Sequence, residues 1–276
     1  MLIGLFENSK PALYELMNSL SMELGFDVKL LKNVDEVTNE KLDGLVVADE
    51  FKSSASIAGI LKQFKNVLLL DPVKAAEVVN QELLIICEEA NVDLMIAGPP
   101  VNPNVFSFIG KYASDPFYVR VIHEEDGIEV VHFDILYKSF YWNAFFSDGD
   151  IRRIKVNALP SVSESGIVFY GKTESAKSIP VDTWFTNLGF CKVQMVKVFS
   201  QKNVVELDCN TWTFKMKNKN IEVVDSYKDC GNTQEPFVRS FIEQLMGKNE
   251  RPLNIPISNF LKVTELYTMA LQKLAL

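Results

Sequence analysis

Short apolar runs alternate with longer amphipathic stretches over the first hundred residues. The runs have the length of strands, and the one at 42–48 is continuous and β-branched, which is typical of a parallel strand covered on both faces. The stretches between them have the apolar spacing of helices. This alternation predicts a parallel sheet with right-handed crossovers. The predicted strands are Leu2–Phe6, Asp27–Leu31, Leu42–Ala48, Val67–Leu70 and Val92–Ala97, and the predicted helices are Pro11–Leu24, one from Ser53 or Ser54 to Phe64, and Val73–Asn91.

The pattern changes beyond about residue 112, where closely spaced strands follow one another without helices between them. Such spacing predicts an antiparallel meander, with a hairpin turn at 217–220. We therefore expect two domains, an α/β domain over 1–112 and an α+β domain over 113–276. The predicted strands are Phe117–Ile122, Ile151–Leu159, Cys191–Phe199, Val204–Leu207, Thr211–Lys217 and Ile221–Val224, and the predicted helices are Asp134–Phe146, Pro236–Met246 and one from Ser258 toward Leu274.

Composition agrees with two globular domains, since 276 residues correspond to about two domains and 47% of them are hydrophobic. A net charge of -8 argues against binding to nucleic acid or to anionic lipid, which both need a cationic surface. No apolar run reaches the ~18 residues of a membrane helix, and no basic segment precedes the first apolar run, as a signal peptide would require. Because the four cysteines show no C-x-x-C spacing, we expect a cytoplasmic protein with reduced thiols.

Chemistry-bearing motifs are scarce in this chain. Two histidines and four scattered cysteines provide no metal-ligand pattern, so no metal site is predicted. No phosphate-binding P-loop or Gly-x-Ser-x-Gly nucleophile motif is present. His123 has the appearance of an isolated residue at the end of a strand. Nineteen phenylalanines against two histidines describe a chain rich in packing residues and poor in general bases.

Several segments, taken in order, resemble the glucose–fructose oxidoreductase/inositol dehydrogenase (Gfo/Idh/MocA) family, with this chain as a divergent or degenerate member. The likeness spans nearly the whole chain and depends on the order of segments more than on identity. The segments that carry it are Leu42–Ala48, Lys65–Pro72, Asn91–Ala97 with Pro103, Phe108–Lys111 with Tyr118–Val121, and Glu235–Ile242 with Gly247, Arg251–Pro252 and Ile257–Ser258.

The resemblance implies a Rossmann-like domain for NAD or NADP and a second domain with a large, mostly antiparallel, open-faced sheet. It also implies hydride transfer on a sugar-like small molecule, with the cofactor supplying the reactive chemistry. Open sheets in this family pair face to face between subunits. Phe190, Val193, Met195, Val198 and Trp212 could form such an apolar face, so we expect a homodimer through the C-terminal sheet.

The dinucleotide motif departs from the family pattern. A dinucleotide site needs glycines after the first strand, where the backbone approaches the pyrophosphate. Here Gly4 is the only glycine, and Phe6 and Glu7 occupy the turn before Asn8 and Ser9. Gly4, Asn8 and Ser9 are the candidate cofactor positions on this side of the cleft.

The family's Glu-Lys-Pro motif is also altered. Leu70, Asp71 and Pro72 stand at the matching positions, so only the proline is retained. Asp71 and Pro72 are candidate cleft positions, with Asp71 as a hydrogen-bond acceptor. The alternative interpretation is that Asp71 is an ordinary turn residue before a proline.

The family's D-x-x-x-H motif on a second-domain helix is best matched by Asp134-Ile-Leu-Tyr-Lys138. Lys138 would replace the histidine that carries the hydroxyl proton, and Asp134 would hold it on the same helix face. An ordinary i, i+4 pair on a solvated face is the alternative. The aromatic segment Phe140–Phe146 is interpreted as core, with a ligand groove as the alternative.

Three functional hypotheses follow. The chain is a degenerate member of the family that does not act as a standard dehydrogenase, and that binds a ligand or serves as a non-catalytic binding or scaffold subunit. Alternatively it is an active NAD(P)-dependent oxidoreductase with a remodelled site. In a third hypothesis, a different ligand occupies the same cleft. NAD or NADP is the expected cofactor if there is one, and the residues also allow a protein that binds none.

Overall fold

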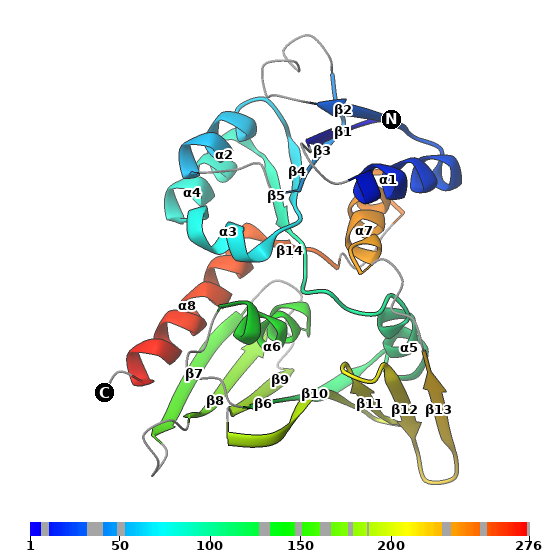
Figure 1. The fold of residues 1–276 in the computed structure, drawn as a ribbon, viewed down its shortest axis with the longest axis vertical. Coiled ribbons are helices and arrows are strands. Elements are labelled where there is room, and N and C mark those ends of the chain that lie inside the picture. The colour runs from blue at the N-terminus through cyan, green and yellow to red at the C-terminus, as the bar shows by residue number, and fades with distance from the viewer. Residues whose placement is uncertain are drawn as a thin grey trace. The chain divides into compact units, whose positions relative to one another are not determined.

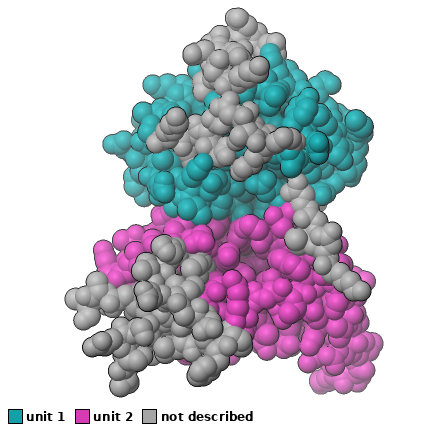
Figure 2. Space-filling view, viewed as in Figure 1, with its two compact units in different colours: residues 1–98, 234–261 teal, residues 99–233, 262–276 magenta. Residues whose placement is uncertain are grey.

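The computed structural model describes residues 1–6, 11–31, 41–48, 53–126, 133–146, 151–160, 167–175, 179–186, 188–227, 233–248 and 253–274. It divides the chain into two compact units, coloured separately in Figure 2. Unit 1 comprises residues 1–98 and 234–261, and unit 2 comprises residues 99–233 and 262–276. Both units are therefore assembled from segments that are distant in the sequence.

Unit 1 contains a six-stranded sheet in the order β14-β5-β4-β3-β1-β2, which is parallel except at β14 (Figure 1). The parallel sheet predicted from the alternating pattern is confirmed. Its central strands are almost wholly buried because helices flank the sheet. The strands are β1 (Leu2–Phe6), β2 (Asp27–Leu31), β3 (Gly44–Val47), β4 (Asn66–Leu69), β5 (Asp93–Ile96) and β14 (Ile255–Pro256).

The helices of unit 1 are α1 (Pro11–Leu24), α2 (Ser54–Leu61), α3 (Pro72–Val78), α4 (Gln81–Ala90) and α7 (Glu235–Leu245). The sequence predicted one helix in place of α3 and α4, and this prediction was wrong. The chain is extended at Val79, and the Asn80 side chain accepts a hydrogen bond from the Leu83 amide as the N-cap of α4. A good N-cap side chain thus starts a new helix.

Unit 2 contains an eight-stranded sheet in the order β13-β12-β11-β10-β6-β9-β8-β7. The meander predicted over its last strands is present from β10 to β13, whereas β6 and β9 pair in parallel. The sheet is therefore mixed. The sequence pattern did not predict β8 and β9. The strands are β6 (Pro116–Asp126), β7 (Ile151–Pro160), β8 (Ile167–Ser175), β9 (Pro180–Thr186), β10 (Leu188–Ser200), β11 (Val204–Asp208), β12 (Thr213–Lys217) and β13 (Glu222–Ser226).

Two helices cover one face of this sheet, α5 (Asn104–Tyr112) and α6 (Phe133–Phe146) (Figure 1). The aromatic residues of α6 are core, as expected, since Tyr141 and Trp142 are fully buried. Phe108 of α5 contacts Phe214 of β12 with ring centroids 5.7 Å apart. We call this side the covered face and the opposite side the open face.

The boundary expected at residue 112 does not coincide with the division in the structure. α5 belongs to unit 2, α7 belongs to unit 1, and α8 (Ile257–Leu274) begins in unit 1 and ends in unit 2. The reason lies in packing, because Leu245 and Phe241 of α7 fill the space above Gly44 in β3. Among the described helices, none is long and apolar enough to cross a membrane.

Candidate functional site

Gly4, a candidate cofactor position, lies in the middle of β1. A Cβ atom at Gly4 would stand 2.6 Å from Leu42 Cδ1, 2.9 Å from Leu45 Cδ1 and 3.0 Å from Leu31 Cδ1. The glycine therefore makes room for three leucine side chains inside the sheet. This packing accounts for the glycine without any approach to a pyrophosphate. Asn8 and Ser9, the other two candidates on this segment, lie outside the described residues.

Asp71 and Pro72 follow β4 at the carboxyl edge of the parallel sheet, where open α/β sheets bind their ligands. The Asp71 carboxylate accepts hydrogen bonds from the amides of Val73 and Lys74, at 3.0 Å and 3.1 Å, and so caps α3. Pro72 occupies the first position of the same helix, where its fixed φ is favourable. Both residues thus have a structural task in starting α3.

The two predicted catalytic residues, Asp134 and Lys138, lie one turn apart on α6. Within the described residues no ion pair or hydrogen bond joins them. Asp134 is exposed, and its charge acts instead on Tyr267 of α8, where burial first and Asp134 second raise the pKa of the phenol. Lys138 is half-buried and stands near His123 of β6, where its charge helps to lower the pKa of the imidazole.

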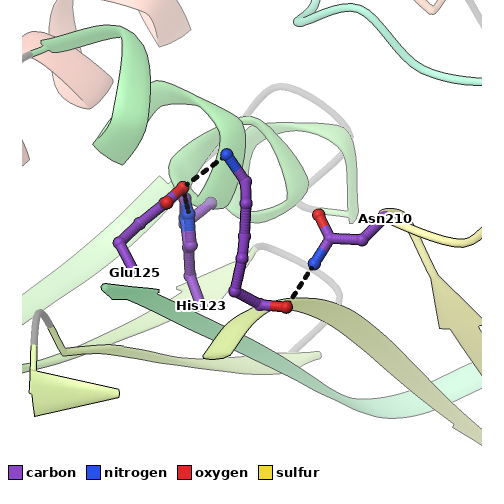
Figure 3. Close-up of polar contacts among 5 residues, drawn as sticks. His123, Glu125 and Asn210 are labelled. Atoms are coloured by element: carbon purple, nitrogen blue, oxygen red, sulfur yellow. Dashed lines mark hydrogen bonds and ion pairs between the residues drawn. The ribbon is translucent and has the colours of Figure 1, made fainter. Parts of the chain in front are cut away.

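His123 is fully buried on the covered face of the unit 2 sheet and is not the isolated residue that the sequence suggested. Its Nδ1 lies 2.9 Å from the Ser139 hydroxyl on α6. Its Nε2 lies 2.8 Å from Glu125 Oε1 on the same strand (Figure 3). Ser139 is fully buried as well. Because β-strand side chains alternate, residues 123 and 125 point to the same face and meet there.

Glu125 completes the cluster at its solvent side. Its Oε1 lies 3.1 Å from the ammonium group of Lys192 on β10, and the side chains of Glu125 and Lys192 are 8% and 54% exposed. The carbonyl of Lys192 accepts a hydrogen bond from the Asn210 amide at 2.9 Å, which ties the backbone of β10 to the turn after β11 (Figure 3). We refer to Ser139, His123, Glu125 and Lys192 as the relay cluster.

The electrostatics of the relay cluster indicate its protonation state. Burial lowers the pKa of His123 from its ordinary 6.5, more strongly than the Glu125 hydrogen bond raises it. Burial by itself would raise the pKa of Glu125, but the hydrogen bonds from His123 and Lys192 lower it below 4.5. The carboxylate is therefore ionised and accepts from Nε2–H, and the neutral ring accepts at Nδ1 from the Ser139 hydroxyl.

Asn143 and Thr183 form a second pair of buried polar residues next to the cluster. The Asn143 amide donates to the Thr183 hydroxyl at 2.8 Å and to the Ser139 carbonyl at 3.4 Å, so α6 is tied to β9. Buried polar networks of this kind are costly unless every member forms its hydrogen bonds. Ionisable groups with shifted pKa values gather at functional sites, which makes the relay cluster a candidate site. No metal-binding group of His, Cys, Asp and Glu side chains occurs in the described ranges.

The sequence carries one signal for the relay cluster. His123 and Glu125 stand two residues apart inside a strand that is otherwise apolar on that face, through Val119 and Val121. Two polar residues on an apolar face must find partners, which predicts a buried pair. Ser139 and Lys192 could not be assigned in this way, because their approach depends on how α6 and β10 pack.

The open face of the unit 2 sheet carries a shallow groove of about 370 Å³ next to Trp184, which is 44% exposed. The strand register places Ile122 beside Trp184, and Arg120 and Glu124 on either side of Ile122. Of the residues expected on an apolar open face, Val193 and Met195 lie there, whereas Val198 is buried on the covered face. The side chain of Phe190 is outside the described part of the chain.

Known structures share this architecture. A dehydrogenase from Chromobacterium violaceum has a TM-score of 0.68 at 13% identity and covers 100% of this chain and 95% of its own. UDP-N-acetylglucosamine 3-dehydrogenase GnnA from Acidithiobacillus ferrooxidans has a TM-score of 0.63 at 12% identity, with 100% and 97% covered. This chain has the Gfo/Idh/MocA fold. The fold expected from the order of segments is thereby confirmed.

A third structure with the Gfo/Idh/MocA fold was solved with small molecules bound. It is an oxidoreductase from Agrobacterium radiobacter in complex with NAD+, L-tartaric acid and magnesium, with a TM-score of 0.60 at 11% identity, and the match covers 100% of this chain and 96% of that one. No protein-family model matches the sequence. No curated protein matches it either.

Proposed function

We propose that this chain keeps the scaffold of a Gfo/Idh/MocA oxidoreductase but does not act as a standard dehydrogenase. The observation that carries the proposal is the structural task of the candidate cofactor residues in unit 1. Gly4 is packed against leucines inside β1, and Asp71, at the position of the family's lysine, caps α3. This chain has the anionic Asp71 at the position of the family's lysine, and its sequence has no glycine in the turn that follows β1.

The experiment is isothermal titration calorimetry of the full chain with NAD, NADH, NADP and NADPH. We expect no binding at micromolar nucleotide. Phosphate groups bind to the backbone amides at a helix N-terminus, and the sequence places the anionic Glu7 in the turn before α1. Micromolar affinity for any of the four would overturn the proposal. If none of the four nucleotides binds, the chain binds another small molecule or serves as a binding or scaffold subunit.

A second candidate function is an active NAD(P)-dependent oxidoreductase with a remodelled site. The relay cluster favours it, because an ionised carboxylate beside a neutral histidine and a lysine can move protons to and from a hydroxyl group. Proteins of the same fold have been solved with NAD+ and with NADP+. A sugar-like substrate would accompany such a reaction.

Lys138 and Asp134 remain the catalytic residues proposed for that second function. If calorimetry identifies a cofactor, Lys138→Ala tests the assignment in a turnover assay. Lys62→Ala, at the C-cap of α2, is the control in the other unit. Turnover that is unchanged in Lys138→Ala removes the residue from the mechanism. A loss of ~100-fold or more, with an altered pH profile, is the expected result for a proton carrier.

The open face supports a homodimer as the partner arrangement. Trp184 and Ile122 form an apolar centre between Arg120 and Glu124, and a two-fold axis through that centre would bring each arginine near the partner's glutamate. Light scattering of the wild type should give a dimer at micromolar concentration, and Trp184→Asp a monomer. Ile85→Asp, at an exposed apolar residue of α4, is the matched control. A wild-type monomer contradicts the arrangement.

A further inference from the structure

The relay cluster leads from the buried interior of unit 2 to solvent. Ser139 and His123 are fully buried, the Glu125 side chain is 8% exposed, and the Lys192 side chain is 54% exposed. The three contacts along this path measure 2.9, 2.8 and 3.1 Å. The two inner residues hold the carboxylate in place, while the outermost residue can move.

The two contacts of Glu125 converge on one oxygen. His123 and Lys192 both bind Oε1, and no described residue donates to Oε2. The Glu125 side chain is 8% exposed, so a ligand that reaches it would find Oε2 as a hydrogen-bond acceptor next to the Lys192 ammonium group as a donor. A ligand that matches both side chains carries a carboxylate for Lys192 and, on a neighbouring atom, a hydroxyl group for Glu125.

The charges around the cluster decide between ligands with these two groups. Among the described residues, the charges that act on His123 are those of two lysines, Lys138 and Lys192, and of one carboxylate, Glu125, and His123 itself is neutral. Glu124 points to the open face, and the charge of Asp134 acts on Tyr267 of α8. The local excess is cationic on a chain whose net charge is -8, so an anionic ligand is favoured over a zwitterion.

We propose that Glu125 and Lys192, positioned by His123 and Ser139, form a binding site for a small hydroxycarboxylic acid. The Lys192 ammonium group pairs with the ligand carboxylate, and Glu125 Oε2 accepts the hydrogen bond of the ligand hydroxyl. His123 and Ser139 are positioning residues that do not touch the ligand. The site needs no nucleotide and is independent of the proposed function.

The test is a titration of the full-length protein with glycolate, followed by the amide resonances of Glu125 and Lys192 in ¹H–¹⁵N NMR at constant ionic strength. Acetate lacks the hydroxyl group, ethylene glycol lacks the carboxylate, and glycine replaces the hydroxyl by an ammonium group. We expect millimolar binding of glycolate, about tenfold weaker binding of acetate and of glycine, and no binding of ethylene glycol. Equal affinity for acetate overturns the role of Glu125, and equal affinity for glycine overturns the choice of an anionic ligand.

Single substitutions test whether glycolate binds at Glu125 and Lys192. Lys192→Met changes an exposed side chain, keeps the fold and should weaken glycolate binding at least tenfold. Glu125→Gln should reduce the preference for glycolate over acetate to less than about threefold. Lys197→Met is the matched control, because Lys197 also belongs to β10 and forms a 3.0 Å ion pair with Glu206. If Lys197→Met weakens glycolate binding as much as Lys192→Met does, the site is not at the relay cluster.

Discussion

The candidate cofactor residues of unit 1 and the relay cluster on the covered face of unit 2 have different kinds of surroundings. In unit 1, Asp71 caps helix α3, and Gly4 in the middle of β1 makes room for leucine side chains. On the covered face, a histidine and a carboxylate are buried at the cost of desolvation, although apolar residues would fill the same space. The comparison shows that the polar residues of the relay cluster form a connected network, whereas Asp71 and Gly4 of unit 1 have local structural tasks.

The largest effect is expected at His123. His123→Ala removes a partner from both Ser139 and Glu125 and leaves a cavity, so it should lower the free energy of unfolding by ~3–5 kcal/mol. Urea denaturation measures this. The triple variant His123→Leu, Glu125→Leu, Ser139→Ala should recover most of the stability and lose the glycolate site. If the triple variant is as unstable as the single one, the cluster is retained for stability, and the contrast between the units fails.

The next effect concerns Gly4. Gly4→Ala places a Cβ within 3.0 Å of three leucines and should cost ~1–3 kcal/mol of stability through overpacking. Gly59→Ala in α2 is the control, because no atom lies within 4 Å of the added Cβ, and it should stabilise the protein by ~0.5–1 kcal/mol. Thermal and urea unfolding report both changes. A neutral Gly4→Ala would show that the glycine is not kept for packing.

A smaller loss is expected at Asp71. Asp71→Ala removes the side-chain cap of α3 and should cost ~1 kcal/mol, whereas Asp71→Asn keeps a good cap and should be nearly neutral. Urea unfolding of the two variants provides the comparison. A neutral Asp71→Ala would remove the capping interpretation and reopen a cofactor role for this residue.

The smallest effect is a pH dependence. The folded protein holds the pKa of His123 below 6.5, so the unfolded chain binds more protons just below that pH. Stability should therefore be full above about pH 6.5 and fall as the pH drops through this value toward the folded pKa. Glu125, with a lowered pKa, adds a further loss below pH 4.5. Urea midpoints at pH 5 and 8 should differ less in the triple variant than in the wild type.

Much of the fold could be predicted because local patterns report it. The bounds of β1, α1 and β2 agree with the prediction to the residue, since apolar runs, Pro11 and Gly25 mark them. The division of α3 from α4 was missed because the cap at Asn80 is a single local contact within a helical pattern. β8 and β9 were missed because their alternation is weak, and β9 also pairs with β6, which is distant in the sequence.

The sequence by itself determined the two classes of sheet, the aromatic core of α6 and the departures from the family's motifs, because these depend on composition and spacing within short segments. Tertiary structure decided which residues form a site. His123 and Glu125 are neighbours by strand alternation, but Ser139 and Lys192 reach them only because α6 packs on β6 and β10 pairs with β6. Contacts between such distant segments follow from packing of the whole sheet, and short sequence patterns carry no record of them.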